Sequence, residues 1–275
     1  MLFPIARAFL LAALFALPLP ASGKPRIVSL LPSLTEDLFA IGAGPQVVGV
    51  SMFTDFPRAA VRLPMVGSSS SIDAERIVRL HPDLVVGIPA QAALVADLRR
   101  SGLRVELLRD DSFDDLFDTL RRLGKLAGHS SEAAALERRL HARTAELVRR
   151  IPAGPRPKVF IVLDTTPIFT VGDASYIADL LQLAGARNAS GVRAAYARYS
   201  AEALVAKQPD ALVGDRASGL AAALQREPWS ALRAVRAGRV YVLADADILE
   251  RPGPRYNAGL EWLIGHVHAR AALAK

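Results

Sequence analysis

Residues 75–86 read ERIVRLHPDLVV, and residues 202–213 repeat that pattern as EALVAKQPDALV. In each copy a glutamate opens a short amphipathic segment, Pro-Asp ends it, and an apolar run follows. Because proline cannot continue a helix, each copy predicts a short helix followed by a buried strand. The copies lie in different halves of the chain, so they predict an internal duplication.

Two weaker sequence similarities between the halves, and several apolar runs, extend this pattern along the chain. DLFAIGAG from Asp37 resembles DLLQLAGA from Asp179, and LRVELL from Leu103 resembles GRVYVL from Gly238. The candidate strands are residues 27–31, 47–50, 84–88, 159–163 and 211–214. Short apolar runs separated by helical segments are typical of parallel strands that are buried on both faces. The predicted fold is therefore α/β, with two related Rossmann-like lobes around central, mostly parallel sheets.

Three helix starts carry recognisable capping residues. Ser33 followed by Glu36 has the spacing of a capping box, in which each side chain bonds the other residue's backbone. Asp73 and Ser200 precede the two copies of the repeated helix, where a side-chain oxygen can accept a backbone N–H. We expect helices to begin at these positions.

One long amphipathic segment separates the two halves. Residues 130–151 place apolar side chains at helical spacing, opposite a face rich in arginine. The apolar positions are Leu136, Leu140, Leu147, Val148 and Ile151, and the arginines are Arg138, Arg139, Arg143 and Arg150. A helix of this length spans about 30 Å and would act as a stiff strut between the lobes. The predicted domains are residues 24–129, the interlobe helix 130–152, and residues 153–275.

The start of the chain has the pattern of a cleavable secretory signal peptide. Arg7 precedes an apolar run from Ala8 to Leu19, and the small residues Ala21 and Gly23 follow. This run is shorter than the roughly 20 residues that a membrane span needs. We expect residues 1–23 to be removed on export to the periplasm.

Composition excludes several classes of protein. The chain has no cysteine, which excludes disulfides, thiolate metal sites, a cysteine nucleophile and lipid attachment to an N-terminal cysteine. The formal net charge is +7, but the basic residues are dispersed among acidic ones, which disfavours nucleic-acid binding. No nucleophile elbow, phosphate-binding loop, zinc-protease motif or dinucleotide fingerprint is present. The five histidines form no helical metal-binding pair, so we expect neither an enzyme nor a dedicated metal site.

Aromatic and charged residues gather at predicted loops near strand ends, where α/β proteins bind ligands. The candidate ligand-binding residues are Phe53, Phe56, Phe169, Tyr196, Tyr199, Asp247 and Arg251. Together they could clamp a large flat ligand between ring faces, with polar groups fixing its orientation. The alternatives are that each ring is a packing residue and that Asp247 and Arg251 form a surface ion pair. Tyr176 is expected in the core.

The segments PRIVSLLPSLTEDLFAIGAGPQVVGVS, FTDFP and ADADILERPGPR, with the repeated Pro-Asp element, resemble the periplasmic binding proteins of cobalamin and iron-chelate importers. The similarity runs from Arg26 to the final helix, and the FTDFP and DILER segments are nearest the cobalamin branch. It implies a ligand cleft between the lobes that moves little on binding. It also implies that Phe53, Phe169 and Tyr196 match aromatic ligand contacts, and that Asp247 and Arg251 match a polar pair.

The resemblance predicts a cobalamin-like corrinoid as ligand, without a resident cofactor. Ser69 and Ile88 stand where well-known cobalamin binders carry tryptophans, so part of the aromatic wall differs. Haem, held by Tyr196 or Tyr199 as an axial phenolate, and ferric siderophores are the alternatives. An enzyme of the same fold and a metal-ion receptor are the competing classes.

Glu75 and Glu202 occupy equivalent places in the repeat. Either can stabilise its helix through the helix dipole, by about 0.3 to 1 kcal/mol. In the family, glutamates at matching positions dock against arginines of the membrane permease. The predicted partner is therefore an inner-membrane ABC permease, approached by a monomeric carrier.

Overall fold

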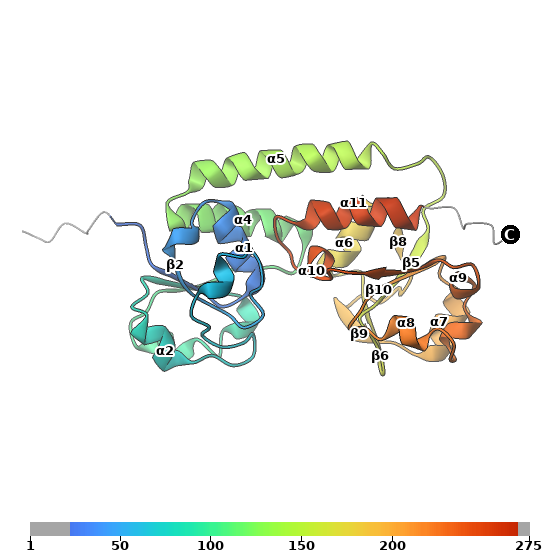
Figure 1. Ribbon diagram of the computed structural model, residues 1–275, viewed down its shortest axis with the longest axis horizontal. Helices are drawn as coiled ribbons and strands as arrows, with labels where there is room; N and C mark the ends of the chain where they lie inside the picture. The colour runs from blue at the N-terminus through green and yellow to red at the C-terminus, as the bar shows by residue number, and fades with distance from the viewer. Residues whose placement is uncertain (1–22, 269–275) are drawn as a thin grey trace, which may run out of the picture.

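The computed structural model describes residues 23–268, and Figure 1 shows two lobes side by side beneath one long helix. The predicted signal peptide, residues 1–23, lies outside the described residues except for Gly23. Within residues 23–268, no helix has both the length and the apolar character that crossing a membrane requires.

The N-terminal lobe is built on a parallel sheet of four strands in the order β2-β1-β3-β4. The strands are β1 (Ile27–Ser29), β2 (Val47–Val50), β3 (Leu84–Gly87) and β4 (Val105–Leu107). The helices are α1 (Pro32–Ala40), α2 (Ala74–Arg79), α3 (Ala96–Arg100) and α4 (Phe113–Ala127), with 3-10 turns at Gly44–Gln46, Ala60–Arg62 and Pro89–Gln91. The three strands predicted in this lobe are confirmed.

The C-terminal lobe has a second parallel sheet, in the order β8-β5-β10-β11. Its strands are β5 (Lys158–Val162), β8 (Arg187–Asn188), β10 (Ala211–Asp215) and β11 (Val240–Leu243). Its helices are α6 (Tyr176–Leu183), α7 (Ala201–Lys207), α8 (Leu220–Ala223), α9 (Arg233–Arg236), α10 (Asp247–Glu250) and α11 (Tyr256–Val267), with a 3-10 turn at Trp229–Ala231.

The two parallel sheets share one topology. The repeated segment forms α2 and β3 in the first lobe and α7 and β10 in the second. Strands β3 and β10 occupy the same third place in their sheets, and β4 and β11 follow them at the edge. The fold is therefore α/β with two related lobes, as the repeat predicts.

A third, antiparallel sheet belongs to the second lobe alone. It contains β6 (Asp164–Thr165), β7 (Ile168–Val171) and β9 (Tyr196–Arg198), in the order β6-β7-β9. Phe169 and Tyr196 therefore lie in strands, and the prediction that they lie in loops was wrong. Their strands are short, and β9 is largely exposed, so no continuous apolar run marks it in the sequence.

Helix α5 (Ser130–Val148) runs along both lobes, as Figure 1 shows. Leu136, Leu140 and Leu147 are buried as predicted, whereas Val148 is partly exposed at the end of the helix. Arg143 Nη2 and Arg150 Nη1 each donate to Glu261 of α11, at 2.8 Å. Since α5 also packs against α4 of the first lobe, it braces both halves.

The predicted caps of the repeated helices are confirmed. Asp73 Oδ1 accepts the backbone N–H of Arg76 at 2.8 Å, and Ser200 Oγ accepts that of Ala203 at 3.0 Å. The capping box of Ser33 and Glu36 was wrong, because α1 starts two residues earlier, at Pro32, with Leu31 as the N-cap residue. Glu36 is consequently a mid-helix residue, and its carboxylate meets arginines of the other lobe.

Candidate functional site

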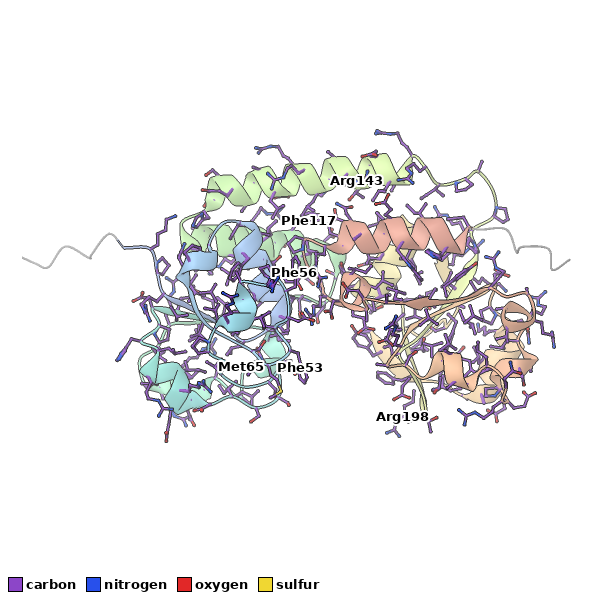
Figure 2. The ribbon with its side chains drawn as sticks, viewed as in Figure 1. Phe53, Phe56, Met65, Phe117, Arg143 and Arg198 are labelled. Atoms are coloured by element: carbon purple, nitrogen blue, oxygen red, sulfur yellow. The ribbon has the colours of Figure 1, made fainter. Side chains whose placement is uncertain are left out.

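The loop after β2 presents aromatic side chains at the edge of the N-terminal lobe. Phe53 is 72% exposed, and Figure 2 shows it on the side that faces the C-terminal lobe. Its backbone has a φ of 69°, a left-handed conformation that is costly for a residue with a bulky side chain. Phe56 is also exposed, and the guanidinium carbon of Arg255 lies 4.5 Å from the centre of its ring.

The C-terminal lobe carries a pair of stacked rings, Phe169 in β7 and Tyr196 in β9. Their ring centres are 6.5 Å apart and their planes differ by 12°. Phe169 lies directly opposite Arg198 in the antiparallel register, and Tyr196 lies opposite Val171. Because side chains alternate along a strand, Phe169, Tyr196 and Arg198 share one face of the sheet. We call Phe169 and Tyr196 the aromatic platform.

Tyr199 does not join this platform. Its ring packs edge-on against Phe160 in the core of the lobe, with ring centres 5.1 Å apart. Its hydroxyl donates to the carbonyl of Ser190 at 3.0 Å. Tyr176 is almost fully buried, as predicted.

Arg251 connects the two lobes. Its Nη1 donates to Glu36 at 3.1 Å and to Asp55 at 2.6 Å, and its Nη2 donates to the carbonyl of Phe53 at 3.1 Å. Its Nε lies 2.9 Å from Asp247. Asp247 and Arg251 therefore do form an ion pair, which was one of the alternatives. The pair is not at the surface, however, because Arg251 is largely buried against the first lobe.

Arg255 makes a second connection to the same carboxylate. Its Nε and Nη2 donate to the two oxygens of Glu36 at 2.7 and 2.8 Å, a bidentate geometry. The hydrogen bonds to Glu36 raise the pKa of Arg255. The interlobe ion-pair network is thus centred on one buried carboxylate; it comprises Glu36, Asp55, Asp245, Asp247, Arg251 and Arg255.

Three central members of this network, Glu36, Asp55 and Arg255, were missed from the sequence. One signal was available, because the helical segment LTEDLFAIG sets Glu36 and Asp37 among apolar residues. A carboxylate that such a helix buries needs a charged partner. The identity of the partner could not be derived, because the arginines are distant in sequence: Arg251 lies 215 positions after Glu36.

Carboxylates surround the platform from both lobes. Burial raises the pKa of Tyr196, and the carboxylates of Asp110 and Glu250 raise it further. Asp110 follows β4 in the first lobe, whereas Glu250 ends α10 in the second. Burial and the carboxylates of Asp215 and Asp247 raise the pKa of Glu250 to about 7. Carboxylates of both lobes thus act on the hydroxyl of Tyr196.

Asp110 gives a pH-dependent prediction. Burial, then Asp111 and Asp115, raise the pKa of Asp110 to about 6 from 3.8. Because the folded state binds this proton more tightly than the unfolded state, the wild type loses stability as pH rises from about 4 to 6. We expect Asp110→Asn to equal the wild type near pH 4 and to exceed it by about 1 kcal/mol at pH 8, after allowance for solvent screening.

The measurement is thermal unfolding of both proteins across that pH range. A gain of about 1 kcal/mol corresponds to about 2 to 4 °C in a chain of this size. Asp97→Asn, in the exposed ion pair with Arg100, is the control and should show no such trend. A constant difference between Asp110→Asn and wild type at every pH would contradict the prediction.

Glu75 and Glu202 lie in the first turns of α2 and α7. Figure 1 shows both helices on the side of the molecule away from α5, one on each lobe. Glu75 is highly exposed and forms one loose ion pair with Arg79 at 3.5 Å, and Glu202 is also exposed. Both carboxylates are therefore accessible to a partner.

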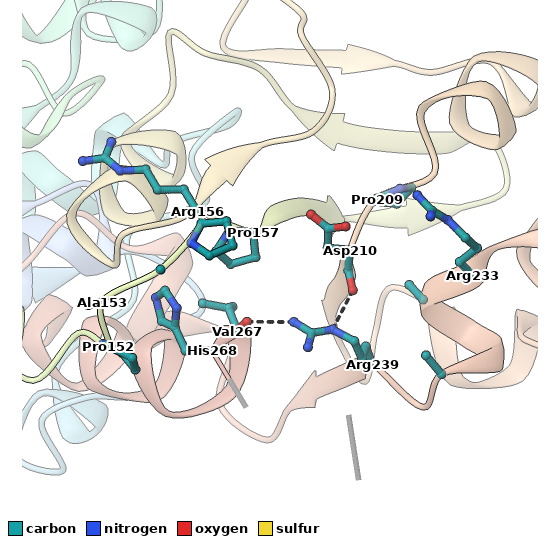
Figure 3. A pocket seen from close by; sticks show the side chains of 14 residues that line it. Pro152, Ala153, Arg156, Pro157, Pro209, Asp210, Arg233, Arg239, Val267 and His268 are labelled. Atoms are coloured by element: carbon teal, nitrogen blue, oxygen red, sulfur yellow. Dashed lines mark hydrogen bonds between the residues drawn. The ribbon is translucent and has the colours of Figure 1, made fainter. Parts of the chain in front are cut away.

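A cavity of about 690 Å³ lies elsewhere, at the outer end of the C-terminal lobe (Figure 3). It is formed by the proline-rich segment after α5, by Arg233, and by Arg239, which donates to the carbonyls of Asp210 and Val267. No predicted ligand residue lines it. Among residues 23–268, no group of three or more His, Asp or Glu side chains is placed to hold a metal ion.

Comparisons with known proteins agree on one family. The sequence pattern of the periplasmic binding proteins matches residues 27–246. The Bacillus subtilis ABC transporter substrate-binding lipoprotein YvrC is 29% identical, with 88% of this chain and 80% of that protein covered. A vitamin B12-binding protein of Vibrio vulnificus is 28% identical, with 93% and 94% covered. A periplasmic haem-binding protein of Pseudomonas aeruginosa superposes with a TM-score of 0.79 at 31% identity, with 90% and 94% covered.

Proposed function

The chain belongs to the periplasmic binding protein family, and from this premise we propose that it captures a cobalamin-like corrinoid between its lobes. It is a substrate-binding protein and not an enzyme, and it works with a membrane permease outside the cytoplasm. The ligand would be bound, carried and released unchanged. Export through a cleaved signal peptide, a periplasmic location and a monomeric state are parts of the same proposal.

The observation that carries the proposal is the aromatic platform of the half-buried Phe169 and the exposed Tyr196, with the exposed Phe53 on the opposite lobe. Parallel rings on one wall offer a flat surface to a macrocycle, and a ring on the other wall can cover its second face. Apolar burial contributes about 25 cal/mol per Å², so a large flat ligand gains most of its affinity here.

The other proposed ligand contacts are Phe56, Asp247 and Arg251; Tyr199 is not among them, because its ring packs against Phe160 in the core. All three nitrogen atoms of Arg251 already face protein oxygens, so little of its hydrogen-bonding capacity remains for a ligand. Its main contribution would be to fix Phe53, whose carbonyl it binds. Asp247 would then meet the amide groups at the rim of a corrinoid.

Haem is the second candidate ligand, since a haem-binding relative superposes well. Ferric haem would need a tyrosine phenolate, and metal binding requires a deprotonated ligand. The raised pKa of Tyr196 opposes its deprotonation, and the hydroxyl of Tyr199 is engaged by Ser190. A vitamin B12-binding relative that aligns over nearly the whole chain supports the corrinoid. A ferric siderophore is the third candidate.

A direct test mixes the purified protein with cyanocobalamin, hemin or a ferric siderophore and removes free ligand by desalting. The retained chromophore identifies the ligand from its absorbance spectrum. Retention of cyanocobalamin alone supports the proposal, and retention of hemin alone replaces it with the haem alternative. If none of the three ligands is retained, the proposal that the protein carries a large chelate is contradicted.

Tyr196→Ala should weaken corrinoid binding by about tenfold to a hundredfold. The reason is the loss of one stacking ring, worth about 1 to 3 kcal/mol. The melting temperature should change little, because Tyr196 is half exposed. Titration calorimetry measures the affinity, and Val148→Ala, a truncation on the far helix α5, is the control. If Tyr196→Ala left the affinity unchanged, the aromatic platform would not be part of the ligand site.

A further inference from the structure

The platform has a polar neighbour that the family resemblance does not assign. Arg198 lies directly opposite Phe169 in the register and on the same sheet face as Tyr196. Figure 2 shows Arg198 at the end of the C-terminal lobe that lies farthest from α5. A guanidinium therefore stands at the outer end of the two stacked rings.

Arg198 is exposed, and no carboxylate of the described residues forms an ion pair with it. Asp164 stands in the same cross-strand row, but β7 separates their strands. Two strand spacings separate their backbones by roughly 10 Å, and no ion pair joins the two side chains in the described residues. The carboxylate of Asp164 also accepts the backbone N–H of Thr166 at 2.8 Å.

Two other arginines of the site, Arg251 and Arg255, are already held by ion pairs within the protein. Arg251 and Arg255 share Glu36, and their remaining nitrogens face Asp55, Asp245 and the carbonyl of Phe53. An anionic group of a ligand would have to break these ion pairs to bind either side chain. The guanidinium of Arg198 takes part in no ion pair of the described residues, so its charge and its planar set of N–H donors are available to a ligand.

The charged side chains near Tyr196 differ in sign from the one beside Phe169. The carboxylates of Asp110, Asp111 and Glu250 act on the hydroxyl of Tyr196. An oxyanion of the ligand placed there would meet like charges in partly buried surroundings, which is unfavourable. At the outer end it would meet the guanidinium of Arg198.

From this arrangement we infer that Arg198 binds an oxyanion group of the macrocycle, a phosphate or a carboxylate, and directs it to the outer end of the platform. The inference rests on the proposed function and adds the residue that sets the orientation of the ligand. In a corrinoid the group is the phosphate of the nucleotide loop, and in haem it is a propionate.

The experiment compares wild type, Arg198→Gln and Arg198→Lys with two ligand pairs. Cyanocobalamin carries the phosphate and dicyanocobinamide lacks it; hemin carries carboxylates and hemin dimethyl ester lacks them. Arg187→Gln removes an exposed arginine from β8 and is the matched control. Calorimetry at low and high salt gives each affinity.

We expect Arg198→Gln to weaken the oxyanion-bearing member of the bound pair by about tenfold and to leave the other member unchanged. The salt dependence of binding should fall in Arg198→Gln and be kept in Arg198→Lys, which retains the charge. The pair that responds identifies the group as phosphate or carboxylate.

An equal change for both members of a pair, or no change at all, would overturn the role of Arg198 and leave the carrier proposal standing. If the wild type binds none of the four macrocycles, both the carrier proposal and this inference are overturned. A comparable loss in Arg187→Gln would show a general effect of surface charge and would also refute the specific role.

Discussion

Glu36→Gln is expected to lower the free energy of unfolding by about 3 kcal/mol. The substitution keeps the shape of the side chain but removes the charge that Arg251 and Arg255 share. Breaking a buried ion pair from one side costs about 3 to 5 kcal/mol, because the remaining charges stay partly desolvated. Asp55, Asp245 and Asp247 still compensate the arginines in part, so we expect the lower end of that range.

Denaturant unfolding of the whole chain measures this effect. Glu75→Gln is the matched control, because its ion pair with Arg79 is exposed and should contribute well under 1 kcal/mol. Ligand affinity should fall in Glu36→Gln as well, since the network holds the backbone of Phe53 through Arg251. Equal stability of the Glu36→Gln and Glu75→Gln variants would mean that the network does not hold the lobes together.

This network also changes what is expected of Arg251→Ala. Considered from the sequence alone, that variant should lose affinity with little loss of stability. In the structure Arg251 contacts Glu36, Asp55 and Phe53 of the other lobe, so its removal should lower stability and affinity together. Tyr196→Ala is therefore the cleaner test of the ligand site.

Reversal of both Glu75 and Glu202 to arginine is expected to abolish uptake while the affinity for the ligand stays unchanged. The two carboxylates are exposed at equivalent places on the two lobes, which suits a partner with two-fold symmetry. Two arginines in their place would repel a basic docking surface, and like-charge contacts at an interface cost several kcal/mol. The measurement is corrinoid-dependent growth of a strain that lacks its own binding protein.

Reversal of Glu132 and Glu146 on α5 is the control, because these residues make the same charge change on the side away from α2 and α7. It should leave growth intact. Lost affinity in the Glu75 and Glu202 double variant would instead place these residues at the ligand, and normal growth would refute docking through them. Both double variants should lose a similar, small amount of stability, because Glu75, Glu202 and Glu132 lie in first turns of helices and Glu146 pairs with Arg143.

Much of the fold was predictable because its signals are local. Apolar runs gave the positions of the strands, and Pro-Asp ended the helix before β3 and before β10. The capping box at Ser33 failed for a local reason, because Pro32 starts the helix and makes Leu31 the N-cap residue. The binding of Glu36 by the opposite lobe was beyond any local pattern.

The candidate site was predictable only as a set of residues. Phe169 and Tyr196 were recognised as aromatic contacts, but their stacking depends on the register of β7 against β9. Tyr199 follows in the chain and looks equivalent to Tyr196, yet it points into the core against Phe160. Strand alternation separates such neighbours onto opposite faces, and a sequence without assigned strands does not reveal which face is which.

By itself, the sequence determined the duplicated α/β topology and the strut of α5, because hydrophobic periodicity and helix-breaking residues act over a few positions. Only the tertiary structure decided that Glu36 joins Arg251 and Arg255, and that Arg198 stands unpaired beside Phe169. These contacts depend on how the lobes dock and on which strands align. Such long-range geometry is set by the packing of the whole chain, and no local pattern encodes it.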